Sequence, residues 1–148
     1  MLKSLPAMSI NSLNNNFDSC RRCTLSNTVL IVDDADFMRM MLRDIVEDMG
    51  MEVTAEACDG AQAMEQYREK NTDLVLLDIT MPVMDGLSAL KQIIKHNPDA
   101  NVVMITALGQ KEQVLACIKA GAKDFIIKPF DHERVTETLD HLMVPQGV

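Results

Sequence analysis

The stretch DLVLLDITMPVMDG at residues 73–86 decides the fold. It places a run of four aliphatic residues, Leu74–Leu77, directly before Asp78. A short continuous apolar run is typical of a parallel strand that is buried on both faces. In open α/β sheets, sites form beyond the carboxyl ends of the strands. The stretch therefore predicts a central strand that presents Asp78 at the edge of a sheet where a site forms.

From residue 28 onward, similar apolar runs alternate with segments of helical period. Four of the five runs are continuous, which indicates parallel strands buried on both faces. In the second run Thr54 and Glu56 alternate with apolar residues, which indicates an edge strand with one face in water. The five predicted strands are Val29–Val32, Val53–Ala57, Leu74–Leu77, Val102–Ile105 and Phe125–Ile127.

The segments between these strands read as helices. The first predicted helix has an apolar stripe and ends at Gly50, a typical C-terminal cap. We interpret the methionines of this stripe as core residues rather than as a binding groove. Asp131 is placed as the N-cap of the last helix. Strands that alternate with helices predict a doubly wound α/β fold with five parallel strands in the order 2-1-3-4-5. The stripes are Phe37, Met40, Met41, Ile45 and Met49 in the first helix, Leu87, Ala89, Leu90, Ile93 and Ile94 in the third, and Val135, Leu139 and Leu142 in the fifth, while the second helix (about Ala61–Glu69) and the fourth (about Lys111–Ala120) are less sharply patterned.

Composition and charge exclude several classes of protein. With 148 residues, 47% of them apolar, the chain has the make-up of one folded domain. A membrane span needs about 20 consecutive apolar residues, far more than the runs found here. The net charge of −8 lacks the basic footprint of a nucleic-acid-binding protein. We therefore expect a protein that binds neither nucleic acid nor membrane.

The first 27 residues differ from the rest of the chain. They are rich in Ser and Asn and have no sustained period, so we expect a disordered extension at 1–27, a folded domain at 28–143 and a short tail at 144–148. A targeting peptide and a mis-assigned start codon are alternatives for the extension. Cys20 and Cys23 have metal-pair spacing but no second pair to complete four ligands, so two exposed thiols are the favoured interpretation. Cys58 and Cys117 read as ordinary buried thiols.

Five chemically active side chains follow the predicted strands. Asp33 and Asp34 follow the first, Asp78 the third, Thr106 ends the fourth and Lys128 the fifth. Three clustered carboxylates raise one another's pKa, and a hard divalent cation relieves their repulsion. Asp78 can act as a nucleophile that becomes an aspartyl phosphate, while the lysine and the hydroxyl contact phosphoryl oxygens. The pattern predicts phosphoryl transfer with Mg²⁺.

Other interpretations remain open from the residues alone. A single Asp after a strand is often only a helix N-cap, which applies to Asp34 or Asp36 taken singly. Asp34-Ala35-Asp36 also has the DxD spacing of phosphatases of the haloacid dehalogenase type, although Phe37 and Met38 do not continue that motif. A scaffold that binds partners without phosphate is a further alternative. P-loop and dinucleotide fingerprints are absent from the sequence.

Four motifs resemble those of the receiver domains of two-component response regulators, in particular the single-domain chemotaxis regulators. They are VLIVDDADFMRMML at 29–42, DLVLLDITMPVMDG at 73–86, VVMITALG at 102–109 and GAKDFIIKPF at 121–130. The resemblance covers about residues 27–143. It implies the doubly wound, flavodoxin-like (βα)5 receiver fold.

The resemblance implies a role for each residue around the phosphorylation site. Asp78 matches the phosphorylated aspartate. Asp33 and Asp34 match the acidic pair that holds Mg²⁺, and the main-chain carbonyl of Thr80 matches a further metal ligand. Lys128 matches the lysine that contacts the phosphoryl group.

The resemblance also implies switch and tuning residues. Thr106 matches the switch hydroxyl and Phe125 the switch aromatic, which is Tyr in many members of the family. Thr80 and Leu108 occupy positions that tune dephosphorylation, and the small Ala107 leaves the acceptor accessible. We hypothesise that Thr106 moves to bond the phosphoryl group and that Phe125 fills the space it leaves.

The implied function is signalling rather than enzymatic turnover. The residues after 143 are too few for a DNA-binding domain, so we expect a cytoplasmic, monomeric regulator whose output is contact with another protein. The resemblance suggests a histidine kinase as phosphodonor, the flagellar motor switch as target and a possible phosphatase. A phosphorelay intermediate or phosphate sink in another pathway is the main alternative.

Overall fold

The computed structural model describes residues 27–143, and the disorder expected for most of the N-terminal extension, the tail 144–148, Cys20 and Cys23 lie outside this range. Within it, five strands alternate with five helices. All four strand pairings are parallel, and the order is β2-β1-β3-β4-β5, as predicted. The strands are β1 (Thr28–Val32), β2 (Glu52–Ala57), β3 (Leu74–Asp78), β4 (Val102–Ala107) and β5 (Asp124–Lys128).

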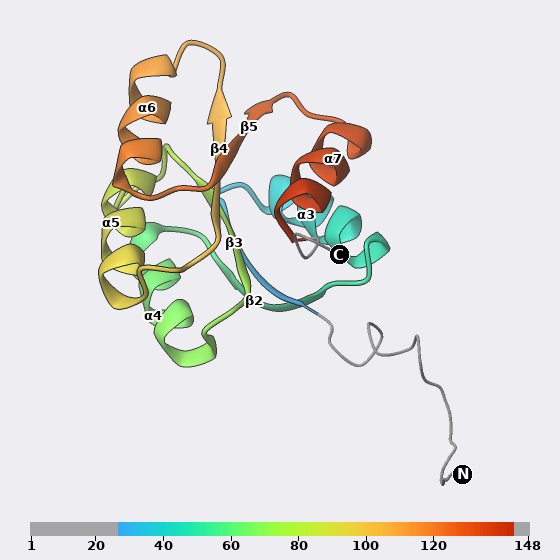
Figure 1. The fold of residues 1–148 in the computed structure, drawn as a ribbon, viewed down its shortest axis with the longest axis horizontal. Coiled ribbons are helices and arrows are strands. Elements are labelled where there is room, and N and C mark those ends of the chain that lie inside the picture. Colours follow the sequence, from blue (N-terminus) through green and yellow to red (C-terminus); the bar gives the residue numbers. More distant parts are fainter. Residues whose placement is uncertain (1–26, 144–148) are drawn as a thin grey trace, which may run out of the picture.

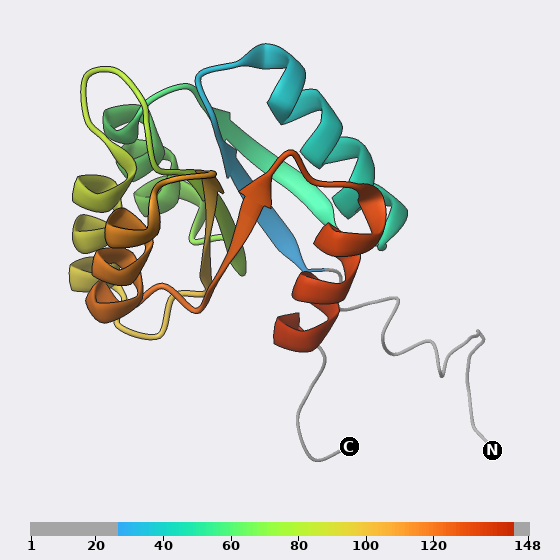
Figure 2. The same cartoon turned by 90° about the horizontal axis from the view of Figure 1, so that it is seen from above.

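The helices cover both faces of the sheet. Figures 1 and 2 show α3 and α7 together on one side, and α4, α5 and α6 on the other. None of the described helices has both the length and the apolar character needed to cross a bilayer. The helices are α3 (Asp36–Asp48), α4 (Gly60–Lys70), α5 (Gly86–His96), α6 (Lys111–Ala120) and α7 (His132–Met143).

Two apolar cores follow from the alternation of side chains along the strands. Leu30 and Val32 of β1 belong to the core beneath α4, α5 and α6, whereas Val29 and Ile31 belong to the core beneath α3 and α7. Successive side chains of a strand point to opposite faces, so each central strand feeds both cores. This double burial explains why β1, β3 and β4 are continuous apolar runs in the sequence.

Side-chain caps begin three of the helices. The carboxylates of Asp59, Asp85 and Asp131 accept hydrogen bonds from main-chain N–H groups in the first turns of α4, α5 and α7. Such caps satisfy donors that a helix start leaves unpaired and typically contribute about 1 kcal/mol each. The N-cap predicted at Asp131 is confirmed.

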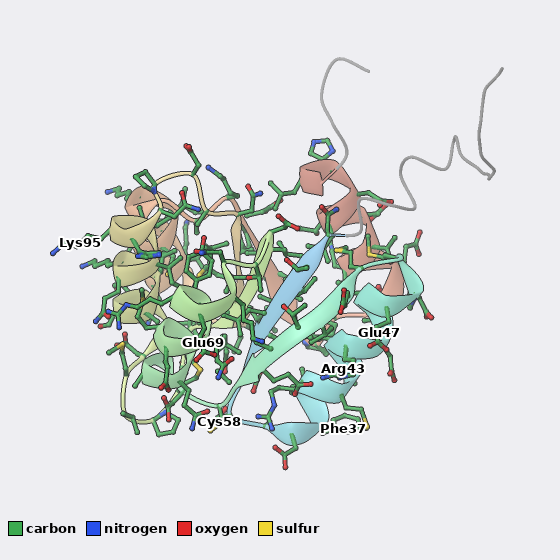
Figure 3. All side chains as sticks on the ribbon, turned by 90° about the horizontal axis from the view of Figure 1, so that it is seen from below. Phe37, Arg43, Glu47, Cys58, Glu69 and Lys95 are labelled. Atoms are coloured by element: carbon green, nitrogen blue, oxygen red, sulfur yellow. The ribbon has the colours of Figure 1, made fainter. Side chains whose placement is uncertain are left out.

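Three predictions about burial were wrong in part. Phe37 (63% exposed) and Met40 lie on the open face of α3, and the helix instead buries Leu42, Ile45 and Val46. Figure 3 shows Phe37 at the start of this helix. The methionine stripe is therefore split between core and solvent, because the buried arc of α3 is rotated relative to the one inferred from Phe37 and Met40.

The second error concerns β5, which was read as buried on both faces. It lies at the sheet edge, and Phe125 and Ile127 are exposed on one face. The third concerns Cys58. Cys117 is fully buried as predicted, but Cys58 at the end of β2 is half-buried with its sulfur 3.2 Å from Oε1 of Gln62. Edge strands have fewer neighbours to cover them, which accounts for both exposures.

Candidate functional site

The carboxyl ends of β1, β3, β4 and β5 bring the predicted residues to one end of the sheet. Asp33, Asp34 and Asp78 form a cluster in which one oxygen of each lies within 4.8 Å of the others. The amino group of Lys128 lies beside two of these carboxylates. The sheet order places β1, β3, β4 and β5 next to one another, which is why residues far apart in the sequence meet here.

Asp33 is fully buried and is fixed from three sides. Its Oδ1 accepts a hydrogen bond from the main-chain N–H of Ala35 (2.9 Å), and its Oδ2 accepts one from Nζ of Lys128 (3.1 Å). Nη1 of Arg39, on α3, donates to the main-chain carbonyl of Asp33 (2.6 Å). A buried carboxylate needs such partners, since its desolvation is otherwise costly.

Asp78 is 6% exposed, and Nζ of Lys128 lies 3.6 Å from its Oδ1. Burial and the nearby charge of Asp33 raise the pKa of Asp78 to about 6, although Lys128 works in the opposite direction. The charge of Asp34 adds to the increase. The cluster thus carries more negative charge than a single lysine offsets, and it favours a proton or a cation at Asp78.

This raised pKa predicts a pH-dependent gain in stability for Asp78→Asn in metal-free buffer. The folded state of the parent binds the Asp78 proton more tightly than the unfolded state does. Protonation of Asp78 therefore stabilises the folded parent below pH 4, and this contribution is lost as the pH rises through about 6. At pH 8 the variant should be more stable than the parent by up to about 3 kcal/mol, at 1.36 kcal/mol per pKa unit. Near pH 4 the difference in stability should fall to a small fraction of this value.

Urea unfolding at pH 4 and pH 8 in the presence of a chelator measures this difference. Asp99→Asn, which removes an exposed carboxylate in the loop before β4, serves as the control and should show no such pH dependence. Equal stability of parent and Asp78→Asn at pH 8 would show that the buried charge is not costly. Added Mg²⁺ should reduce the gain, because a cation stabilises the ionised carboxylate.

A close backbone contact fixes the position of Asp78. A Cβ atom added at Gly86 would lie 2.2 Å from the carbonyl oxygen of Asp78 and 2.7 Å from Cα of Ile79. The N–H of Gly86 also donates to the carbonyl of Ile79 (2.7 Å). The first turn of α5 therefore packs against the end of β3, and only a residue without a side chain fits there.

Thr106, at the end of β4, is 1% exposed, and its hydroxyl faces Gln110. Oγ1 of Thr106 lies 2.9 Å from Oε1 of Gln110 and 3.2 Å from the carbonyl oxygen of Ala107. Nε2 of Gln110 donates to Oγ1 of Thr80, in the loop after β3 (2.8 Å). The predicted switch hydroxyl therefore has protein partners in this structure.

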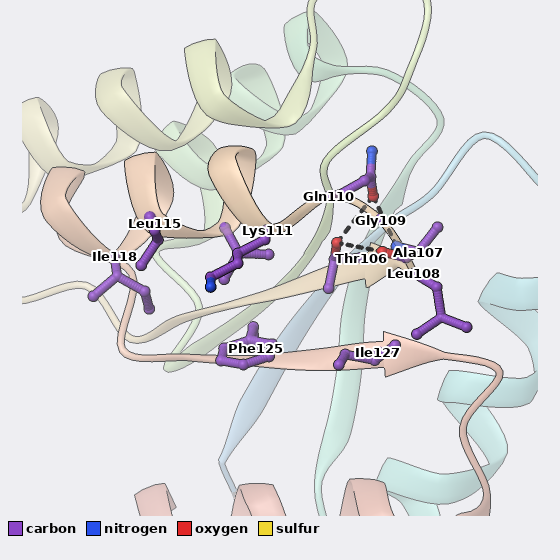
Figure 4. A pocket seen from close by; sticks show the side chains of 11 residues that line it. Thr106, Ala107, Leu108, Gly109, Gln110, Lys111, Leu115, Ile118, Phe125 and Ile127 are labelled. Carbon is purple, nitrogen blue, oxygen red and sulfur yellow. Dashed lines mark hydrogen bonds between the residues drawn. The ribbon is translucent and has the colours of Figure 1, made fainter.

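An apolar groove lies beside this hydroxyl. Figure 4 shows it between α6 and the ends of β4 and β5. Phe125 is 37% exposed and lines the groove, and Leu108 is largely exposed at its rim. Ala107 is exposed at the end of β4. The groove is lined by Thr106, Ala107, Leu108, Gly109, Gln110, Lys111, Val114, Leu115, Ile118, Phe125 and Ile127.

The N-cap interpretation of Asp34 and Asp36 does not hold. Ala35 occupies the N-cap position of α3, and among the described residues no side-chain hydrogen bond caps this helix. Asp34 is exposed and joins the acidic cluster, whereas Asp36 pairs with Arg39. The two carboxylates of the DxD sequence therefore have different surroundings.

Residues 29–140 match the response regulator receiver domain family. The chain belongs to this family. The chemotaxis protein CheY of Thermotoga maritima is 52% identical over 116 residues, which are 78% of this chain and 97% of the relative. CheY of Bacillus subtilis is 53% identical over the same length, with the same shares of the two chains.

Solved structures agree with this membership. A chain in the crystal structure of the CheX–CheY–BeF3–Mg²⁺ complex from Borrelia burgdorferi superimposes with a TM-score of 0.76 at 40% identity. The match covers 80% of this chain and 90% of that chain. The receiver fold predicted from the sequence is confirmed, as is the resemblance to chemotaxis regulators.

Three residues at the site were not found from the sequence. Arg39 holds the main chain of Asp33, Gly86 allows α5 to approach Asp78, and Gln110 joins Thr80 to Thr106. The position of Gly86 was indicated by the sequence, since this glycine follows the capping residue Asp85 in the stretch at 73–86. Arg39 and Gln110 carried none, because their roles depend on long side chains that reach across the fold.

Proposed function

We propose that this receiver domain is a CheY-type chemotaxis regulator that is phosphorylated on Asp78 by a histidine kinase. The observation that carries the proposal is the buried Asp78 beside two further carboxylates and Lys128 at the carboxyl end of the central strand. Identity of 52–53% to two CheY proteins along nearly their whole length supports the chemotaxis assignment. A stand-alone receiver in another phosphorelay remains the alternative to be tested.

The donor set fits one Mg²⁺ ion. Its three carboxylates are hard oxygen ligands, and the raised pKa of Asp78 reflects negative charge that a divalent cation would neutralise. Asp33, Asp34 and Asp78 would hold the ion, and we assign a further contact to the main-chain carbonyl of Thr80. When bound, Mg²⁺ neutralises charge on the phosphoryl oxygens during transfer.

The transfer itself requires little covalent chemistry from the chain. A carboxylate oxygen of Asp78 forms the new bond to phosphorus, the P–N bond of the kinase phosphohistidine breaks, and the released imidazole takes up a proton. Nζ of Lys128, 3.6 Å from Asp78, is within reach of an added phosphoryl oxygen. The positive charge of Lys128 stabilises the dianionic phosphoryl group that forms on Asp78.

The output follows from Thr106 and Phe125. The new phosphoryl group offers acceptor oxygens close to the hydroxyl of Thr106, and the hydroxyl moves to donate to one of them. Phe125 then turns toward the space beside β4, which changes the surface of α6, β5 and α7. Both states exist before phosphorylation, which shifts their balance. We propose that the partner reading this surface is a flagellar motor switch protein, and that the regulator acts as a cytoplasmic monomer.

Replacing Thr106 by Ala is expected to uncouple phosphorylation from output. Each tenfold shift between the two states corresponds to about 1.4 kcal/mol, roughly one charge-assisted hydrogen bond. The variant should therefore still take up a phosphoryl group, yet lose about tenfold or more of the increase in affinity for the motor switch protein. Binding is measured with and without beryllofluoride, which mimics the phosphoryl group.

The control variant is Thr54→Ala, which removes a hydroxyl on β2 at the opposite edge of the sheet from β5. It should respond to beryllofluoride like the parent. A Thr106→Ala protein that binds its target with the full increase in affinity would contradict the switch. A parent that binds this target equally with and without beryllofluoride would contradict the chemotaxis assignment.

A further inference from the structure

The side chain of Gln110 connects two loops at the phosphorylation site. It lies directly before α6, and its carboxamide contacts Thr106 and Ala107 at the end of β4 and Thr80 in the loop after β3. Figure 4 shows the contacts of Gln110 with Thr106 and Ala107. We call this set of four residues, Thr80, Thr106, Ala107 and Gln110, the Gln110 bridge.

The hydrogen-bond partners define the orientation of the carboxamide. The main-chain N–H of Ala107 can only donate, and it lies 2.7 Å from one end of the amide, so this end must be the oxygen Oε1. Oε1 has two lone pairs, and the second accepts from the hydroxyl of Thr106 (2.9 Å). The NH₂ end is then directed to Oγ1 of Thr80 (2.8 Å). All three contacts are compatible at once.

This arrangement occupies the only proton that Thr106 can donate. A threonine hydroxyl carries a single proton, and here its two acceptors are Oε1 of Gln110 and the carbonyl oxygen of Ala107. A phosphoryl oxygen on Asp78 has to compete for the same proton. The bond to Gln110 must therefore break before Thr106 can bond the phosphoryl group.

We propose that Gln110 is a positioning residue that holds Thr106 in the orientation of the unphosphorylated state and releases it when Asp78 is phosphorylated. This inference rests on the function proposed above. Because Gln110 is the N-cap residue of α6, its release also frees the start of the helix whose Leu115 and Ile118 line the apolar groove. The bridge thus links the phosphoryl site to the surface that changes.

The test measures the affinity for beryllofluoride in the presence of Mg²⁺ by fluorine NMR. Gln110→Met keeps the length of the side chain but cannot bond Thr106. Thr106 then keeps only its longer contact, to the carbonyl oxygen of Ala107 (3.2 Å), so one hydrogen bond fewer opposes its movement. The variant should bind beryllofluoride about two- to tenfold more tightly than the parent, the range for one neutral hydrogen bond. Gln113→Met, at an exposed position on the same helix, should bind like the parent.

A second pair of variants separates this role from a general effect on folding. In a Thr106→Val background there is no hydroxyl to hold, so adding Gln110→Met should leave the affinity for beryllofluoride unchanged. A change of the same size in both backgrounds, or no tightening or a weaker affinity in the Gln110→Met single variant, would overturn the proposal. If the parent itself binds no beryllofluoride, it is the proposed function that fails.

Discussion

Replacing Asp78 by Ala is expected to abolish phosphorylation of the protein by small phosphodonors. The parent should take up about one phosphoryl group per chain from acetyl phosphate and Mg²⁺, and the variant should take up none, since it lacks the nucleophilic oxygen. Asp33 cannot replace it, because that carboxylate is fully buried and bonded to Lys128 and Ala35. Intact-mass spectra of the two proteins measure this difference.

The matched control for this experiment is Asp99→Ala, which removes an exposed carboxylate outside the acidic cluster. It should be phosphorylated like the parent. Circular dichroism of Asp78→Ala verifies that the variant is folded, and we expect it to be, since the substitution removes a buried charge. A phosphoryl adduct of undiminished yield on folded Asp78→Ala would contradict the assignment.

Removing Mg²⁺ is expected to slow phosphorylation by at least about 100-fold, the loss typical when a single group stabilising transition-state charge is removed. Without the ion, the phosphoryl oxygens approach three carboxylates whose charge is offset by one lysine. Repulsion then opposes the attack of Asp78. The rate of adduct formation is measured with excess chelator and during titration with Mg²⁺.

Two neighbouring carboxylates provide a sharp comparison for this metal dependence. Asp34→Asn removes a member of the acidic cluster and should raise the Mg²⁺ concentration needed for half-maximal rate by about tenfold or more, equivalent to about 1.4 kcal/mol. Asp36→Asn removes a carboxylate only two residues away, which instead pairs with Arg39. It should leave the requirement unchanged. Equal requirements in both variants would exclude Asp34 as a ligand.

The topology could be predicted from the sequence because the pattern of apolar residues along each strand reflects which of its faces are buried. Continuous runs such as Leu74–Leu77 are explained by burial on both faces, and the alternation in 53–57 by an edge position. The same rule was wrong for β5, because two of its three consecutive apolar residues line the open groove beside α6 and are partly exposed. Periodicity detects apolar surface, but it does not distinguish a core from an exposed apolar face.

The site was predictable where residues directly follow strands. Asp33, Asp34, Asp78 and Lys128 meet because the ends of parallel strands lie at one edge of the sheet, and a pattern along the chain is enough to find them. Gln110 was missed because its place depends on side-chain length and on the turn before α6. No sequence period reports such contacts.

The most direct test of the central claim is to locate the phosphoryl group on the protein without any substitution. The protein is treated with acetyl phosphate and Mg²⁺, the acyl phosphate is reduced with borohydride to homoserine, and peptides are sequenced by mass spectrometry. We expect homoserine at residue 78 and at no other aspartate. Homoserine at residue 33 or 34, or phosphorylated protein without homoserine at residue 78, would contradict it.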